Sequence, residues 1–171
     1  MPEPIQTPEP LPLRVSVILL AYNQAPGVRR ALAALEQSER RQQIEILVVD
    51  CASTDGTSKI DAEFPAVQML RLPHHIGAGR ALNIGVRTAK ADYVLFLTPD
   101  VEVQPNPVMA LADALDADAT TVAACPLLTD PPGQPTPRLY KIPAPAAVTA
   151  PRAAQSVDLS EPNPTVEFPS L

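Results

Sequence analysis

At residues 14–22 the sequence reads RVSVILLAY, an apolar run rich in valine and isoleucine. Such a run predicts a β-strand buried on both faces, as in a parallel sheet covered by helices. A second run, IEILVV at residues 44–49, has the same character and ends at Asp50. Between them, apolar residues at Val28 and three, four and seven positions later have the spacing of an amphipathic helix. Together these segments predict a β-α-β unit.

The same alternation continues along the chain, and we predict three further strands and three further helices. The strands are expected at residues 67–72, 93–97 and 120–125. The helices are expected as a short one ending near Ala62, one at residues 77–89, and one that begins at Pro107 with Asn106 as its N-cap. The fold class is therefore α/β, with three layers: a mainly parallel sheet with helices on both faces.

Composition divides the chain of 171 residues into three parts. Its 22 prolines far exceed the usual share of about 5%, and most lie in residues 1–12 and 129–171. Proline-rich segments with few aromatic or β-branched residues do not form a packed core. We therefore predict a Pro-rich N-terminal arm at residues 1–12, a folded domain at residues 13–128, and a Pro-rich, poorly ordered tail at residues 129–171.

Charge and apolar patterning exclude several classes of protein. The net charge is −6 and no segment is basic, which argues against a nucleic-acid binder. The longest apolar run, residues 15–21, is far shorter than the ~20 residues of a membrane span, and the N-terminus lacks the pattern of a secretory signal. Cys51 and Cys125 lie far apart without metal-ligand spacing. They predict free thiols in a reducing cytoplasm.

Polar residues follow the predicted strands at the edge where parallel sheets bind ligands. A carboxylate at such a strand end accepts hydrogen bonds from a base or ribose, and Asp100 offers a ligand for a divalent cation that neutralises a diphosphate. Glycines before a helix allow close backbone approach, and the helix start presents N–H groups to an anion. For Asp55 we predict turn and cap chemistry. The strand-end segments are YN at 22–23, Asp50 with STDGT at 53–57, HIG at 75–77, and TPD at 98–100.

Four longer stretches, which overlap these strand-end segments, carry a resemblance to a known family. They are VSVILLAYN at 15–23, EILVVD at 45–50 with STDGT at 53–57, GAGRALNIG at 77–85, and ADYVLFLTPD at 91–100. In this order and at this spacing the chain resembles the family 2 glycosyltransferases, GT-A fold enzymes that transfer a sugar from a nucleotide-diphospho-sugar donor. The resemblance covers residues 14–125.

The resemblance implies roles for seven residues on the donor side of the site, with Mn²⁺ or Mg²⁺ as the cofactor. Ala21 and Tyr22 would flank the nucleotide base, and Asp50 would contact the base or ribose. Asp100 would bind the metal and the diphosphate. The donor-side loop and helix would contribute Gly77, Arg80 and Asn83.

The chain also departs from the family pattern. Cys51 stands where a second acidic residue or Asn is frequent, His75 where Asn is usual, and Thr98 where the first carboxylate of Asp-x-Asp is usual. The family's catalytic base and acceptor site lie on a second half, well beyond the metal motif. We therefore expect the donor half to be present and the acceptor half to be missing, name no general base, and keep open a partner chain that supplies the acceptor half.

Three functions follow from these observations. The leading one is a cytoplasmic, metal-assisted glycosyltransferase acting on a cell-envelope polysaccharide, lipid or protein acceptor. The second is a truncated or degenerate non-catalytic domain that binds a nucleotide-sugar or serves as a partner surface. The third is a dinucleotide-binding oxidoreductase, because Gly77 and Gly79 follow a strand and open a helix. Against the third, Leu82 occupies the position of the last glycine of that fingerprint.

Overall fold

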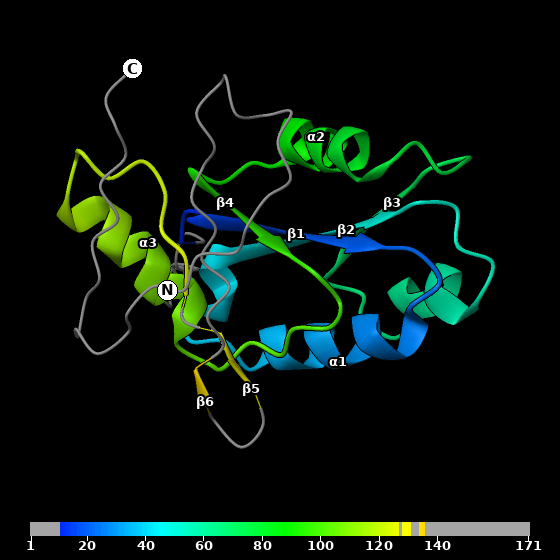
Figure 1. Ribbon diagram of the computed structural model, residues 1–171, viewed down its shortest axis with the longest axis horizontal. Helices are drawn as coiled ribbons and strands as arrows, with labels where there is room; N and C mark the ends of the chain where they lie inside the picture. The colour runs from blue at the N-terminus through cyan, green and yellow to red at the C-terminus, as the bar shows by residue number, and fades with distance from the viewer. Residues whose placement is uncertain (1–10, 127, 131–133, 136–171) are drawn as a thin grey trace, which may run out of the picture. The chain divides into compact units, whose positions relative to one another are not determined.

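The computed structural model describes residues 11–126, 128–130 and 134–135 (Figure 1). The N-terminal arm and the tail expected from composition lie almost entirely outside these residues, and the boundaries of the three predicted parts remain predictions. The chain divides into two units, Met1–Ala124 and Cys125–Leu171. The second contains an antiparallel pair, β5 (Thr129–Asp130) with β6 (Gln134–Pro135).

The first unit is built on a four-stranded parallel sheet in the order β3-β2-β1-β4. β1 lies between β2 and β4, with Val15 opposite both Ile44 and Tyr93. The first four predicted strands are confirmed, each to within a residue at either end. The strands are β1 (Val15–Ala21), β2 (Ile44–Asp50), β3 (Gln68–Arg71) and β4 (Tyr93–Leu97).

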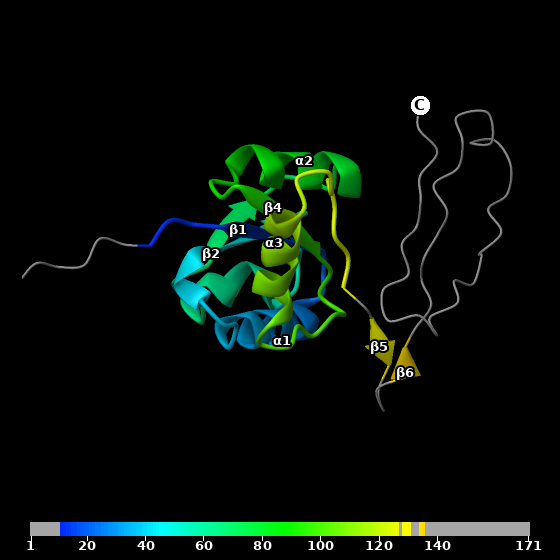
Figure 2. The same cartoon turned by 90° about the vertical axis from the view of Figure 1, so that its left-hand side faces the viewer.

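Helices cover both faces of this sheet (Figures 1 and 2). One face carries α2 (Ala78–Thr88). The other carries α1 (Ala25–Glu36), α3 (Pro107–Ala117) and the 3₁₀ helix η2 (Gly56–Ala62), while a short 3₁₀ helix, η1 (Arg41–Gln43), precedes β2. The predicted three-layer α/β architecture is confirmed. Within the described ranges, no helix is long and apolar enough to cross a membrane.

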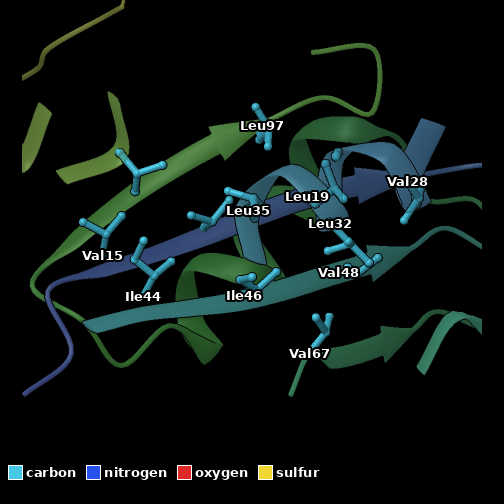
Figure 3. Packing of buried hydrophobic residues seen from close by; sticks show 14 of the residues in the cluster. Val15, Leu19, Val28, Leu32, Leu35, Ile44, Ile46, Val48, Val67 and Leu97 are labelled. Carbon is cyan, nitrogen blue, oxygen red and sulfur yellow. The ribbon is translucent and has the colours of Figure 1, made fainter. Parts of the chain in front are cut away.

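The larger part of the core lies between the sheet and α1 (Figure 3). Leu19 of β1 and Val48 of β2 point toward this helix and are fully buried. Burial of a Val or Leu side chain stabilises a fold by about 1.5–3 kcal/mol. The predicted apolar stripe of α1 is confirmed, because all four of its members are inaccessible to solvent: Val28, Ala31, Leu32 and Leu35.

On the opposite face, α2 approaches β1 unusually closely. A Cβ atom added at Gly85 would lie 2.7 Å from Cγ2 of Ile18 and 3.1 Å from its Cδ1. Ile18 is fully buried in the central strand, so it has no free space into which to move. The distance between α2 and the sheet therefore depends on glycine at position 85.

The strand predicted at residues 120–125 is wrong. These residues form no strand, and Val122 is 95% exposed. The threonines that favoured a strand instead bind the preceding aspartate: the Thr120 amide and hydroxyl donate to Asp118 Oδ1 (2.9 and 2.7 Å), and the Thr121 hydroxyl donates to Oδ2 (2.8 Å). This local turn competes with sheet pairing for the same chain. Among the described residues, β4 is therefore one of the two edge strands of the sheet, with β3 at the other edge.

Asp55 holds the starts of two helices, which confirms its predicted turn and cap role. Its Oδ1 accepts the amide of Thr57 at 3.0 Å and so caps η2, while its Oδ2 accepts the amide of Ala25 in the first turn of α1 at 2.9 Å. The hydrogen bonds that Asp55 accepts from Thr57 and from the Ala25 amide lower the pKa of its carboxyl, because they stabilise its charged form.

We predict that Gly85→Ala lowers the free energy of unfolding by about 1–3 kcal/mol, as overpacking of a filled core does. Alanine alone would favour the helix by up to about 1 kcal/mol, so a net loss reports the clash with Ile18. Urea denaturation measures the effect. The matched control is Gly79→Ala, whose Cβ would meet nothing within 4 Å. Equal stability of the two variants would contradict this packing.

We predict that Asp55→Ala lowers the free energy of unfolding at pH 7 by about 1–2 kcal/mol, the usual cost of losing a cap. The folded-state pKa of Asp55 is lowered. Its contribution is therefore complete above the unfolded pKa of about 3.9 and is lost as pH falls through the folded value. Urea denaturation between pH 7 and pH 3 should show the wild type converging on the variant in acid. A difference that does not change with pH would refute this capping role.

Candidate functional site

The carboxyl ends of β1, β2 and β4 form one edge of the sheet, which we call the rim. Ala21, the last residue of β1, lies opposite Asp50, the last residue of β2. β4 ends at Leu97, opposite Leu19, so its following turn lies beside the end of β1. Because neighbouring strands are ~4.8 Å apart, the ends of β2 and β4 are about 10 Å apart across β1.

Asp50 is held rigidly at the rim. Only 2% of the residue is exposed, and its Oδ1 accepts the amide of Ser53 at 3.0 Å. Its carbonyl accepts the amide of Leu72 at 2.8 Å, which fixes the chain that leaves β3. Between Asp50 and Ser53, Ala52 adopts a positive φ of 63°, a conformation that costs free energy in a residue with a side chain. The loop after β2 is therefore a defined, strained structure around a buried carboxylate.

Asn23 joins this loop to the one that follows β1. Its φ is 51°, in the left-handed region that Asn tolerates better than most residues. Its amide donates to Ser53 Oγ at 2.9 Å, and its Oδ1 accepts the amide of Thr54 at 2.8 Å. In the sequence, Asn23 directly follows the predicted strand at residues 14–22. That position was the available signal, but we assigned Asn23 no role from it.

Tyr22 and His75 form an aromatic pair at the rim. Their ring centroids are 4.8 Å apart and their planes meet at 70°, an edge-to-face arrangement that is favourable for aromatic rings. Both residues are exposed, so the ring faces remain accessible. In contrast, the side chain of Ala21 is fully buried, and its carbonyl accepts the amide of Cys51 at 2.9 Å.

The start of α2 supplies backbone amides and a cation. Gly77 is its N-cap, and its φ of 85° strongly favours glycine. No side chain caps the helix, and N–H groups at a helix start attract anions. Arg80 and Asn83 follow on α2, and both are exposed. These groups suit an anionic ligand.

Asp100 lies on a tight turn that follows β4. The amide of Val101 donates to the carbonyl of Thr98 at 3.2 Å and closes the turn. Pro99 is buried beneath it, whereas Thr98 and Asp100 are exposed. An exposed carboxylate on a fixed turn at the rim is accessible to a ligand or a cation.

No three His, Cys, Asp or Glu side chains gather into a metal site in the part of the chain that the structure describes. Mg²⁺ is commonly bound in proteins through one or two carboxylates together with substrate phosphates. Asp100 therefore fits a cation whose remaining ligands come from a diphosphate and water. It does not fit a cation held by protein alone.

Cys51 is unsuited to nucleophilic chemistry. It is buried, and burial, together with the charge of Asp50, raises the pKa of its thiol. The thiolate is the reactive form of cysteine, so the surroundings of Cys51 keep its thiol in the less reactive, protonated form. Cys51 and Cys125 are both free thiols, as predicted.

Comparisons with known proteins agree with this architecture. The family described as "Glycosyl transferase family 2" matches residues 16–161. An N-acetylglucosaminyl-diphospho-decaprenol L-rhamnosyltransferase of Mycobacterium tuberculosis is 30% identical over 140 residues, which cover 75% of this chain and 45% of the relative. Glycosyltransferase AglE of Haloferax volcanii is 32% identical over 91 residues, covering 50% of this chain and 30% of the relative.

Solved structures show the same fold. The crystal structure of Staphylococcus aureus TarS 1–349 superposes with a TM-score of 0.57 at 24% identity, covering 61% of this chain and 33% of that one. The same protein has been solved in complex with UDP-GlcNAc, and that structure has a TM-score of 0.57. The likeness supports the GT-A fold predicted from the sequence.

The chain spans about half the length of the curated relatives that it matches first, 45% in the M. tuberculosis rhamnosyltransferase. The family match nevertheless covers most of this chain, including the parallel sheet from residue 16 onward and its rim. It also spans the four segments that carried the resemblance, apart from Val15. The chain belongs to glycosyl transferase family 2.

Proposed function

We propose that this chain binds the nucleotide-diphospho-sugar donor of a glycosyltransferase reaction at the rim of its sheet. The observation that carries the proposal is the placement of Tyr22, Asp50 and the Asp100 turn after three adjacent parallel strands. Ligands of open α/β sheets bind in this position. Family membership supports the same class of reaction.

In this proposal the nucleoside lies toward β1 and β2. Tyr22 presents an exposed ring, braced by His75, on which a base can stack. Asp50 accepts a hydrogen bond from the base or ribose through a carboxylate that the Ser53 amide already orients. Ala21 is buried, so it would contribute to the base site through its backbone.

The diphosphate then lies toward β4 and α2. Asp100 would hold Mg²⁺ or Mn²⁺, which supplies charge neutralisation to a departing nucleoside diphosphate when it is bound. Gly77 allows the chain to approach the phosphates closely, and Arg80 and Asn83 offer a cation and an amide from α2. We assign these roles because Arg80, Asn83 and Asp100 are exposed and because the segments that carry these residues resemble the donor side of the family.

We assign no residue of this chain to the acceptor site and name no general base. A sugar acceptor, such as a lipid or polysaccharide of the cell envelope, would be bound by further protein, including a partner chain. The M. tuberculosis relative, by its name, transfers L-rhamnose to a lipid-linked sugar diphosphate, so a deoxyhexose is one candidate for the transferred group. The free thiols agree with a cytoplasmic location.

One alternative keeps the binding site without the transfer. Thr98 stands in place of the first carboxylate of the family's metal motif. This substitution favours a domain that binds a nucleotide-sugar but does not turn it over.

We predict that calorimetry of the full chain detects binding of at least one of UDP-, GDP- and dTDP-sugars, and that Mn²⁺ strengthens this binding. Asp100→Ala should remove the metal-dependent gain, lowering affinity by at least about 10-fold, the lower end of what losing a group around a metal site costs. Asp92→Ala is the control, because Asp92 is also an exposed acidic residue but lies at the opposite end of β4. Absence of binding to the whole panel would sink the proposal.

Turnover separates the two functions. We predict metal-dependent hydrolysis of the bound donor, measured as release of nucleoside diphosphate, that disappears in Asp100→Ala and persists in Asp92→Ala. Such a result rejects the non-catalytic alternative. Donor binding without any release in the wild type would support that alternative instead.

A further inference from the structure

The first turn of α1 touches the turn that carries Asp100. A Cβ atom added at Gly27 would lie 2.8 Å from the carbonyl oxygen of Pro99 and 3.2 Å from its Cβ. Contacts this short are not made by real Cβ atoms, so something must move if position 27 has a side chain. Pro99 is buried, and a buried backbone group has little room to give.

The atom in contact belongs to the peptide that joins Pro99 to Asp100. Peptide groups are planar and rigid, so displacing the Pro99 carbonyl rotates or shifts the backbone of Asp100 directly. The turn is short, because the Val101 amide closes it on the Thr98 carbonyl at 3.2 Å. The displacement therefore cannot be absorbed before it reaches Asp100.

The rest of this connection is also fixed to α1 and the core. Arg30 of α1 pairs with Glu102 at 3.3 Å, and the Glu39 amide, just beyond α1, donates to the Pro105 carbonyl at 2.8 Å. Val101 and Val103 pack against the larger core. The chain after β4 thus packs along α1. Within this packing, Gly27 contacts Pro99, the residue just before Asp100.

The same turn of α1 is fixed to the other carboxylate loop. Asp55 accepts the Ala25 amide at 2.9 Å, and Asn23 exchanges hydrogen bonds with Ser53 and Thr54. Residues 23–27 therefore connect the loop that orients Asp50 with the turn that carries Asp100.

We propose that Gly27 is a positioning residue for the metal–diphosphate part of the donor site. Because Gly27 has no side chain, the Pro99–Asp100 peptide can pack directly against α1. This contact fixes the position of the Asp100 carboxylate relative to Asp50. The inference rests on the proposed donor-binding function. It adds a residue that contacts neither donor nor metal and acts through Asp100.

The test compares Gly27→Ala with Gly56→Ala, whose added Cβ would make only ordinary contacts, 3.5 Å or more from Arg29 and Ala25. Alanine favours a helix over glycine, so a loss in Gly27→Ala reports the contact with Pro99. Hydrogen exchange of the Val101 amide, measured without any ligand, reports the stability of the turn. Calorimetry with UDP, in Mn²⁺ and in EDTA, reports the affinity of the site with and without the metal.

We expect faster exchange of the Val101 amide in Gly27→Ala, and a 10–100-fold loss of UDP affinity in Mn²⁺ with the affinity in EDTA unchanged. Gly56→Ala should match the wild type in both measurements. Pro99→Gly, which leaves α1 uncrowded but frees the turn, should reproduce the Gly27→Ala result if that variant fails to fold.

Two results would overturn the inference. Unchanged exchange of the Val101 amide in Gly27→Ala would show that Gly27 does not hold the turn in place. Faster exchange with an unchanged UDP affinity in Mn²⁺ would show that the contact between α1 and the turn does not affect the site. If instead exchange changes but the wild type binds no nucleotide, the donor-binding function fails and the role of Gly27 in it falls, while the contact between α1 and the turn stands.

Discussion

The burial of β1, in which only Leu20 is partly exposed, is the constraint on which the rest of the structure depends. Val17, Ile18 and Leu19 are inaccessible to solvent, and the strand pairs with β2 on one side and β4 on the other. A strand buried in this way has no freedom to shift register, because a slip of one residue would exchange its two faces. Both carboxylate loops are therefore placed by reference to one strand, whose own loop lies between them.

The two carboxylates of the rim have opposite environments. Asp50 is buried and oriented by a backbone amide, whereas Asp100 is exposed on a short turn. A buried, oriented acceptor suits recognition of a neutral donor group, because a poorly placed partner leaves it unsatisfied. An exposed carboxylate suits a hydrated cation that arrives with a diphosphate. The division of labour proposed for the site follows from this difference.

Much of this was predictable from the sequence, since buried parallel strands have a simple signature. The runs that became β1 and β2 are continuous and apolar, and the helical stripe at Val28 has its full periodicity. The strand expected at 120–125 failed because its threonines bind Asp118, a local competition that β-propensity does not describe. The contact of Gly27 with Pro99 joins residues far apart in sequence, so no local pattern could reveal it. The position of Asn23 after a strand was visible in the sequence. Its hydrogen bonds to Ser53 and Thr54 were not, because these residues lie on another loop.

The most direct test of the central claim locates the ligand on the chain itself. Paramagnetic Mn²⁺ added with UDP broadens the NMR signals of nearby amides, so its position can be mapped without measuring activity. We predict selective broadening in the turn at 98–101 and at the start of α2, residues 77–80, with residues 91–93 at the other end of β4 unaffected. Broadening centred on the amino ends of the strands, or spread evenly over the surface, would contradict a donor site at the rim.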